Sequence, residues 1–213
     1  MFKVYRKTMV ITSLLTVLPM LVGMALWNSL PEQMATNFGA DGLPNGWSSR
    51  TFAVFGLPLL LLGLHWLCVV ATLNDPKRRN VGGKMLSVIF WIIPLTSLFV
   101  CLSIYAYGLG WKVNISTLCL AMVGVLFLFL GNYLPKTRQN FTVGIKLPWT
   151  LSSEENWNRT HRLAGWLWMI GGVLILMCGF LTPSRMSGIF MTTIIVLGGV
   201  PVVYSFFLYK RGI

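Results

Sequence analysis

The sequence has few charged side chains and very few acidic ones. Only five residues are Asp or Glu, and charged residues of both signs make up 10% of the 213 residues. In soluble domains the charged fraction is about a quarter. Hydrophobic residues account for 55% of the chain. This composition excludes an ordinary soluble globular domain.

Cysteine pairs and the common catalytic motifs are also missing. Cys68, Cys101, Cys119 and Cys178 form no Cys-x-x-Cys pair, so neither a disulfide framework nor a zinc site is indicated. The sequence contains no nucleophile elbow, no His-Glu-x-x-His and no phosphate-binding glycine loop. We therefore expect no metal, no cofactor and no enzymatic reaction.

What the sequence does contain is a series of long apolar runs. A helix needs about 20 apolar residues to cross the hydrocarbon core of a bilayer. Six runs reach this length, at residues 8–28, 52–73, 85–107, 113–133, 163–182 and 187–208. The predicted fold class is an all-α membrane protein, with six transmembrane helices in a single helical domain over residues 1–213.

The basic residues are distributed unevenly between the connections. Of the 17 Lys and Arg residues, only Arg50, Lys112 and Arg185 lie in the three loops on one side, and the other 14 lie on the opposite side. The excess of basic residues predicts that both termini are cytoplasmic. A net charge of +12 would suggest nucleic acid as the partner of a soluble protein. Here it indicates topology and contact with membrane lipid, without direct nucleic-acid binding.

Two polar segments interrupt the apolar runs, and the first spans residues 28–50 on the predicted outer side. Its Asp41-Gly42 and Pro44-Asn45-Gly46 sequences are turn signals, because Gly and Asn accept positive φ. The segment is either a compact connector or a receptor surface for an external ligand. The candidate residues of the second interpretation are Glu32, Asn37, Phe38, Asp41 and Trp47.

One ionisable side chain stands out within the second apolar run. His65 lies there without an acidic residue at the same depth. An ionisable group inside a membrane is a functional candidate by default. The alternative is a neutral histidine that makes one hydrogen bond to a neighbouring helix.

The second polar segment, residues 132–165, is the longest in the chain and is predicted to be cytoplasmic. Ser152-x-x-Glu155 reads as a capping box, which predicts a helix that begins near Ser153 and continues into the fifth span. On this helix Glu155 precedes Arg159 by four residues, a spacing typical of an ion pair. Glu154, Trp157 and His161 are predicted to share a neighbouring face.

Proline and glycine recur inside the spans. A proline in a span frees a carbonyl that neighbouring helices must satisfy, and such prolines occur at positions 19, 58, 94 and 201. Gly165, Gly172 and Gly179 repeat every seven residues, which predicts a smooth stripe for close helix packing.

Residues 131–165 also carry motifs in a characteristic order. These are Gly131-Asn-Tyr-Leu-Pro-Lys136, Asn140, Gly144-Ile145, Pro148-Trp-Thr-Leu-Ser-Ser-Glu-Glu155, Trp157 and Thr160-His-Arg-Leu-Ala-Gly165. In order and spacing they resemble the Sdp immunity-protein family of bacterial membrane proteins.

The outer segment resembles the amino-terminal membrane domain of unknown function that often precedes that family's motifs. Its matching positions are Leu30-Pro31, Thr36, Phe38, Gly42, Pro44 and Trp47. Asn37 and Asn45 stand where that domain is expected to have His and Asp, so no metal or proton role is carried over to them. The two resemblances divide the chain into a two-span region at 1–73 and a four-span region at 85–213.

The resemblance implies immunity to a secreted antimicrobial peptide toxin, in the inner membrane of a bacterium. In the best-known member of that family the toxin-engaged protein recruits a cytoplasmic transcriptional repressor, and the resemblance thereby implies possible signalling through residues 132–165. The residues expected to bind a ligand or partner are Asn132, Pro135, Asn140, Pro148, Trp149, Thr150, Glu154, Glu155, Trp157, Arg159, His161 and Arg162.

Two alternatives belong to other functional classes. A small transporter or exporter of an amphiphilic substrate would need ionisable groups at membrane depth, where only His65 is available. A membrane-embedded enzyme could use Glu154, Glu155 and His161 as acid–base groups. Helix capping and ion pairing account for these three residues without catalysis.

Overall fold

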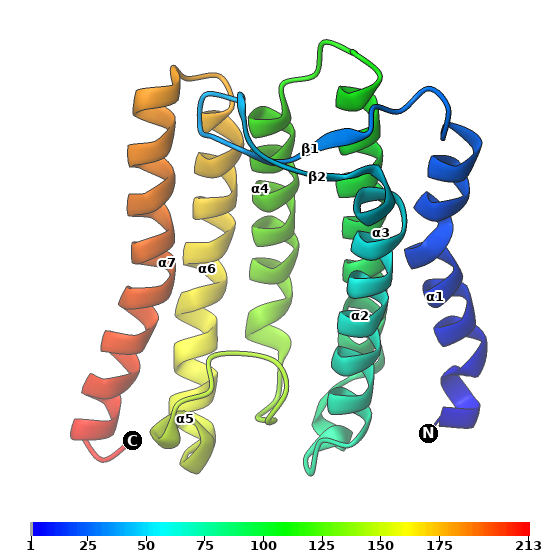
Figure 1. Cartoon of the computed structure of the whole chain (residues 1–213). Coiled ribbons are helices and arrows are strands. Elements are labelled where there is room, and N and C mark those ends of the chain that lie inside the picture. The colour runs from blue at the N-terminus through cyan, green and yellow to red at the C-terminus, as the bar shows by residue number, and fades with distance from the viewer. Residues whose placement is uncertain (1) are drawn as a thin grey trace. The chain divides into compact units, whose positions relative to one another are not determined.

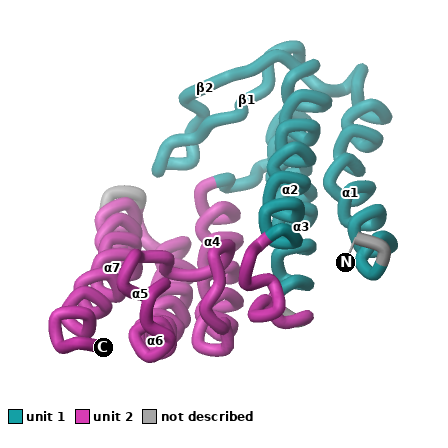
Figure 2. The backbone as a smooth tube through the Cα atoms, turned by 90° about the horizontal axis from the view of Figure 1, so that it is seen from below, with its two compact units in different colours: residues 1–74, 86–115 teal, residues 75–85, 116–213 magenta. Residues whose placement is uncertain are grey.

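The computed structural model describes residues 2–213, and the chain is mostly helical (Figure 1). Six helices are long and apolar enough to span a membrane, as the apolar runs predict. The chain forms two compact units (Figure 2). The first contains the residues up to Asn74 together with Leu86–Ile115, and the second contains Asp75–Met85 and Ser116–Ile213.

The long helices carry the six candidate spans, and shorter elements connect them. The long helices are α1 (Phe2–Ala25), α2 (Leu57–Leu73), α3 (Gly83–Gly108), α4 (Ile115–Tyr133), α6 (Glu154–Cys178) and α7 (Pro183–Lys210). The short elements are β1 (Gln33–Phe38), β2 (Pro44–Ser49), the π-helix η1 (Phe52–Gly56), the 3-10 helices η2 (Arg78–Asn80) and η3 (Leu134–Lys136), and α5 (Pro148–Ser152).

The polar segment at residues 28–50 forms a β-hairpin, which the all-α prediction missed. Strands β1 and β2 pair antiparallel, with Ala35 opposite Trp47. The turn between them has Gly42 at φ 79°, a conformation that favours glycine, in agreement with the predicted turn signals. The six-residue strands alternate too weakly in polarity to be recognised by periodicity alone.

The hairpin packs on the helices of its own unit. Met34 is fully buried in a cluster that includes Val54, Ile104 and Tyr105, and the Phe38 and Tyr107 rings meet edge to face at 5.0 Å. In Figure 1 the hairpin lies at the end of α2 and α3 opposite the N-terminus of α1. One face of the hairpin is therefore part of the core.

Neighbouring side chains satisfy carbonyls that two prolines leave without a donor. Pro58 has no N–H for the Ala53 carbonyl at the i+5 spacing of the π-helix, and the Tyr105 hydroxyl donates to that oxygen at 3.4 Å. In α7, Pro201 leaves the Leu197 carbonyl free, and Trp168 Nε1 donates to it at 3.1 Å. At these two positions the expected satisfaction by neighbouring helices is confirmed.

In the second unit the glycine stripe of α6 lies against α4, as predicted. A Cβ atom at Gly172 would lie 2.8 Å from Gly124 O and 2.8 Å from Leu128 N. A Cβ at Gly165 would lie 2.8 Å from Gly131 O. Because these neighbours are backbone atoms, the two helices can approach this closely only with glycine.

Candidate functional site

Asp75 holds the loop that follows α4 and η3. Its carboxylate is 3% exposed and accepts hydrogen bonds from Phe141 N at 2.8 Å, from the Thr142 hydroxyl, and from Lys77 N at 2.7 Å. Charge-assisted hydrogen bonds of this kind are stronger than those between neutral groups. Asp75 was not among the predicted site residues, although it is the only acid next to the basic residues 77–84.

Gln139 forms a second clamp on the same loop. Its Nε2 donates to the carbonyls of Thr150 and Leu151, both at 2.9 Å. Lys77 Nζ donates to its Oε1, and Asn80 Nδ2 donates to its backbone carbonyl at 2.7 Å. A single buried amide therefore joins residues 77–80 to α5. No sequence motif identified it.

Asn140 shapes the turn between these clamps. Its Oδ1 accepts from Thr142 N at 2.9 Å and from Val143 N at 2.7 Å, and its Nδ2 donates to Arg138 O at 2.8 Å. A short polar side chain bonded to the backbone ahead of it mimics a turn. Asn140 is 1% exposed and thus acts within the fold.

Trp157 and His161 fasten the loop to α6. Trp157 Nε1 donates to Thr137 O at 2.8 Å, and Ile145 N donates to His161 Nε2 at 2.9 Å. His161 Nδ1 lies 2.8 Å from Trp157 O, so this nitrogen carries the proton. Gly144 has φ 119°, and a Cβ there would lie 2.3 Å from His161 Nε2. Only glycine fits this position.

Helix α5 is fixed by two of its own side chains. The Thr150 hydroxyl accepts from Leu147 N at 2.9 Å and donates to Ile145 O at 2.8 Å. Trp149 Nε1 donates to Ser205 Oγ at 2.9 Å. Because Thr150 is fully buried, it closes the turn from within the fold.

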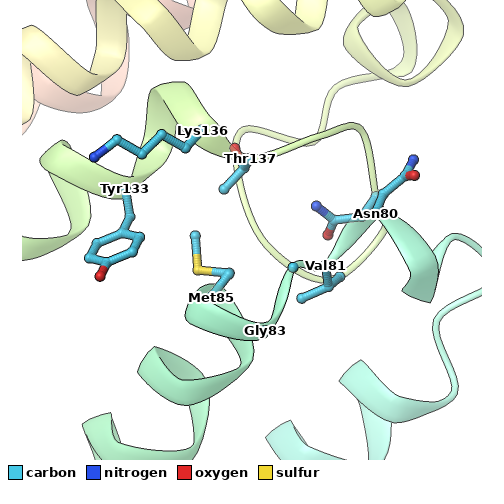
Figure 3. Close-up of a pocket in the computed structure, with 9 residues that line it drawn as sticks. Asn80, Val81, Gly83, Met85, Tyr133, Lys136 and Thr137 are labelled. Carbon is cyan, nitrogen blue, oxygen red and sulfur yellow. The ribbon is translucent and has the colours of Figure 1, made fainter.

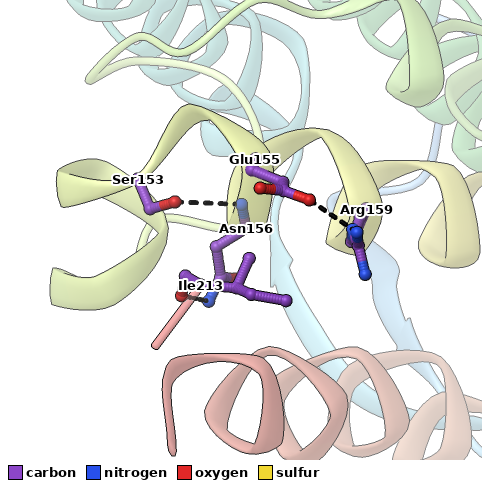
Figure 4. Close-up of polar contacts among 5 residues, drawn as sticks. All are labelled: Ser153, Glu155, Asn156, Arg159 and Ile213. Atoms are coloured by element: carbon purple, nitrogen blue, oxygen red, sulfur yellow. Dashed lines mark hydrogen bonds and ion pairs between the residues drawn. The ribbon is translucent and has the colours of Figure 1, made fainter. Parts of the chain in front are cut away.

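The predicted capping box is wrong, because Ser153 caps α6 instead of Ser152. Ser153 Oγ accepts from Asn156 N at 3.2 Å (Figure 4). Ser152 instead belongs to α5 and donates to Trp149 O. The short extra helix shifts the start of α6 by one residue, and the cap moves with it.

The predicted ion pair on α6 is confirmed. Arg159 Nη2 lies 2.5 Å from Glu155 Oε1, with both side chains about half exposed (Figure 4). Asn156, on the buried face, donates through Nδ2 to Ser205 O at 3.0 Å and to Ile213 O at 3.1 Å. The buried face of this turn, at Asn156, therefore bonds α7, whereas the face that carries Glu155 and Arg159 is exposed.

Comparison with known proteins bears on this segment directly. Residues 136–207, which contain Gln139, α5 and the Trp157–His161 pair, match the SdpI/YfhL protein family. Residues 14–62, which include the hairpin, match the Domain of unknown function (DUF1648). The resemblance to this family and its amino-terminal domain is thereby confirmed.

The similarity extends beyond the SdpI/YfhL region. The chain is 22% identical over 209 residues to the Immunity protein SdpI of Bacillus subtilis (strain 168), covering 96% of this chain and 97% of that protein. No solved structure matches the chain significantly. The family and the six apolar helices make this a multi-pass membrane protein.

The predicted site residues of the polar segment at 132–165 divide into two groups by burial. One group forms the interior of the fold: Asn140, Thr150, Trp157 and His161 are buried and Trp149 is half-buried. The other group is exposed: Asn132, Pro135, Pro148, Glu154, Glu155, Arg159 and Arg162. Only the exposed group is available to a docking partner without unfolding the loop.

The DUF1648-matching hairpin places its candidate residues on two sides. Phe38 packs against Tyr107. The exposed side carries Glu32, Asn37, Asp41 and Trp47, with Trp47 57% exposed. The structure thus leaves four of the five candidate residues of the hairpin segment exposed.

Arg50 anchors this hairpin, although it was not among the predicted site residues. Its Nη1 donates to Trp27 O at 2.7 Å and to Leu30 O at 2.9 Å. Its guanidinium lies 4.4 Å from the centroid of the Trp27 ring. A planar cation that bonds carbonyls and stacks on an aromatic ring suits this role better than lysine would.

His65 lies in α2, and among the described residues it makes no hydrogen bond to the candidate residues of the hairpin. It is 1% exposed, and Nε2 lies 3.1 Å from Thr12 Oγ1. Among the described residues no partner reaches Nδ1. Among the same residues no three His, Cys, Asp or Glu side chains are arranged to hold a metal ion.

Proposed function

We propose that this chain is a membrane immunity protein that protects its cell against a secreted antimicrobial peptide. The observation that carries the proposal is the similarity of 96% of the chain to an immunity protein, with the family match over 136–207. A peptide of this kind acts on the membrane, so a multi-pass protein that carries a loop domain on each side is suited to detect it.

In the proposed topology both termini and residues 132–165 face the cytoplasm of a bacterium, and the hairpin faces outward. The 14-to-3 distribution of basic residues supports it. Within the first unit, the N-terminus of α1 and the hairpin lie at opposite ends of the helices (Figure 1). Within the second unit, α5 and the C-terminus lie at the same end.

The hairpin is the proposed sensing surface. Trp47 and Leu43 are 57% and 63% exposed, while Met34 and Arg50 hold the opposite side of the hairpin to the helices. An amphiphilic peptide can bury its apolar side chains against Trp47 and Leu43. Exposed aromatic groups on a rigid support bind at a low cost in conformational entropy.

The polar segment at residues 132–165 is the proposed signalling surface for a cytoplasmic repressor. Its interior bonds hold the loop rigid, and its exposed Arg159, Glu155 and Arg162 present charges on one helix. A toxin can change what this surface presents only if it binds two arrangements of the protein with different affinity. The surface is therefore proposed as the output of such a change.

We propose a non-enzymatic role. Glu155 is paired with Arg159, and both ring nitrogens of His161 are used in hydrogen bonds inside the fold. General acid–base catalysis needs a group within hydrogen-bond reach of a substrate, and these two are already committed to other partners. The family relationship points in the same direction.

The decisive experiment expresses the chain in a toxin-sensitive bacterium and measures survival during exposure to the secreted peptide. We expect survival with the wild type and its loss in the variant Leu43→Ser/Trp47→Ser. The matched control is Trp111→Ser, which removes another exposed tryptophan of the first unit, 66% exposed and outside the hairpin. No protection by the wild type, at confirmed membrane expression, would contradict the function. Equal loss in the control would contradict the hairpin as the sensor.

Signalling and topology need separate tests. For signalling, Arg159→Glu/Arg162→Glu should abolish toxin-dependent recovery of the repressor in the membrane fraction while membrane expression is retained.

For topology, single cysteines at Asn45 and Ser152 are introduced into a chain whose native cysteines are replaced. A membrane-impermeant maleimide should label Asn45→Cys in intact cells and Ser152→Cys only after lysis. Labelling of Ser152→Cys in intact cells would reverse the proposed topology.

A further inference from the structure

A pocket of about 240 Å³ lies within the second unit, between the start of α3 and the end of α4. Its walls include Asn80, Val81, Met85, Tyr133, Lys136 and Thr137 (Figure 3). The volume is below the range of about 300–1,000 Å³ typical of sites for drug-sized ligands. It suits a small group, and it is too small for a folded peptide.

The pocket lies at the boundary of the apolar spans. The candidate span in α3 begins at Met85, and the span that contains α4 ends at Lys136, so both residues mark the same end of their helices. This is the depth at which a bilayer changes from hydrocarbon to headgroups. A ligand of the pocket therefore has lipid as its nearest abundant source.

The chemistry of the walls is amphiphilic. Val81 and Met85 are buried apolar side chains, 5% and 6% exposed. Lys136 is exposed, and its Nζ donates to Asn132 Oδ1 at 3.1 Å. Lys136 Nζ also lies 5.4 Å from the centroid of the Tyr133 ring, which lines the pocket. Because an ammonium group has three donors, Lys136 can turn to bind an anion beside Tyr133.

Exposed basic residues directly precede the pocket residues 80–83 in the sequence. Arg78 and Arg79 are exposed on the short helix η2 next to Asn80. The nearest acid in sequence, Asp75, is buried and accepts three hydrogen bonds inside the fold. Basic side chains at a membrane surface attract anionic lipids. An anion is thus the complementary occupant.

We infer that this pocket binds the phosphate headgroup of an anionic membrane lipid. Lys136 contacts the phosphate, Arg78 and Arg79 add long-range attraction, and the glycerol and first methylene groups lie against Val81 and Met85. This site does not depend on the proposed immunity function, because it uses neither the hairpin nor the exposed face of α6.

The test uses the purified full-length protein in a neutral detergent and measures thermal unfolding against lipid concentration. The probes are short-chain phosphatidylglycerol, phosphatidylcholine with the same acyl chains, and inorganic phosphate. We expect saturable stabilisation by phosphatidylglycerol alone. Lys136→Gln should weaken its apparent affinity about fivefold. Lys210→Gln removes the same charge from an exposed site at the end of α7 and should leave the affinity unchanged.

A second variant tests the cavity without changing any charge. Gly82 lines the pocket, and a Cβ there meets nothing within 4 Å, so Gly82→Leu has room to fold and should block binding. Equal stabilisation by phosphatidylcholine would overturn the inference, as would equal stabilisation by inorganic phosphate. An equal loss of affinity for phosphatidylglycerol in Lys210→Gln would also overturn it, because it would indicate attraction by general surface charge. Unchanged affinity in both Lys136→Gln and Gly82→Leu would overturn it as well.

Discussion

Trp157 and His161 stack with their ring centroids 3.9 Å apart and their planes inclined by 21°. Each ring also bonds a different part of the preceding loop, Trp157 at Thr137 O and His161 at Ile145 N. The pair thus fixes both ends of an irregular nine-residue stretch on one turn of α6. This arrangement makes the two residues structural supports of the exposed surface beside them.

Replacing Trp157 tests this support. Trp157→Phe keeps an aromatic ring but removes the donor to the buried Thr137 carbonyl. We expect the free energy of unfolding to fall by about 1–3 kcal/mol, measured by thermal or denaturant unfolding in detergent. Trp166→Phe, at a position of the same helix that is 62% exposed, is the control and should change it little. Equal stability of both variants would show that the Trp157 hydrogen bond to Thr137 O does not stabilise the fold.

Asp75 is expected to control the mobility of the loop. In Asp75→Asn one carboxylate oxygen becomes an NH2 group that faces donors, so at least one of the bonds to Phe141 N, Thr142 Oγ1 or Lys77 N is lost. Amide hydrogen exchange over residues 139–146 should accelerate at least about tenfold. Asp41→Asn changes an exposed acid of the hairpin and should leave exchange in this loop unaltered. Unchanged exchange in Asp75→Asn would show that the carboxylate is not needed.

Arg50 is expected to hold the hairpin in place. Arg50→Gln removes the Nη1 donor to Trp27 O and Leu30 O and the stacking on the Trp27 ring. Hydrogen exchange in residues 33–49 should rise at least about tenfold, without a change in residues 139–146. The control Lys112→Gln removes an exposed charge of the same unit. If both variants exchange alike, Arg50 is not the anchor.

The close approach of α4 and α6 predicts that Gly172 does not tolerate a larger side chain, and Gly188 in α7 is the control. Gly172→Ala places a Cβ 2.8 Å from backbone atoms of α4 and should destabilise the protein by about 1–3 kcal/mol. Gly188→Ala, inside α7 with nothing within 4 Å of its Cβ, should be neutral or stabilising by up to about 1 kcal/mol. Unfolding of the two variants side by side measures the difference, and the opposite order would contradict the packing.

Much of the architecture followed from local sequence patterns. The apolar runs predicted the six spanning helices because length and hydropathy alone decide whether a segment can cross a bilayer. The spacing of Glu155 and Arg159, and of the three glycines in α6, predicted an ion pair and a packing face because helical geometry is fixed. The hairpin was missed because two six-residue strands carry little periodic signal and depend on the helices beneath them.

The sequence by itself therefore determined the helical class, the family relationship and the charge asymmetry. Only the tertiary structure decided which residues of 132–165 are available to a partner. Burial is a property of the folded arrangement: Trp157, His161 and Asn140 carry polar groups that look like contact residues in the sequence, yet their bonds are made inside the protein. Asp75 and Gln139 gained their roles in the same way, because the loop and α5 groups that they bind lie more than ten residues away along the chain.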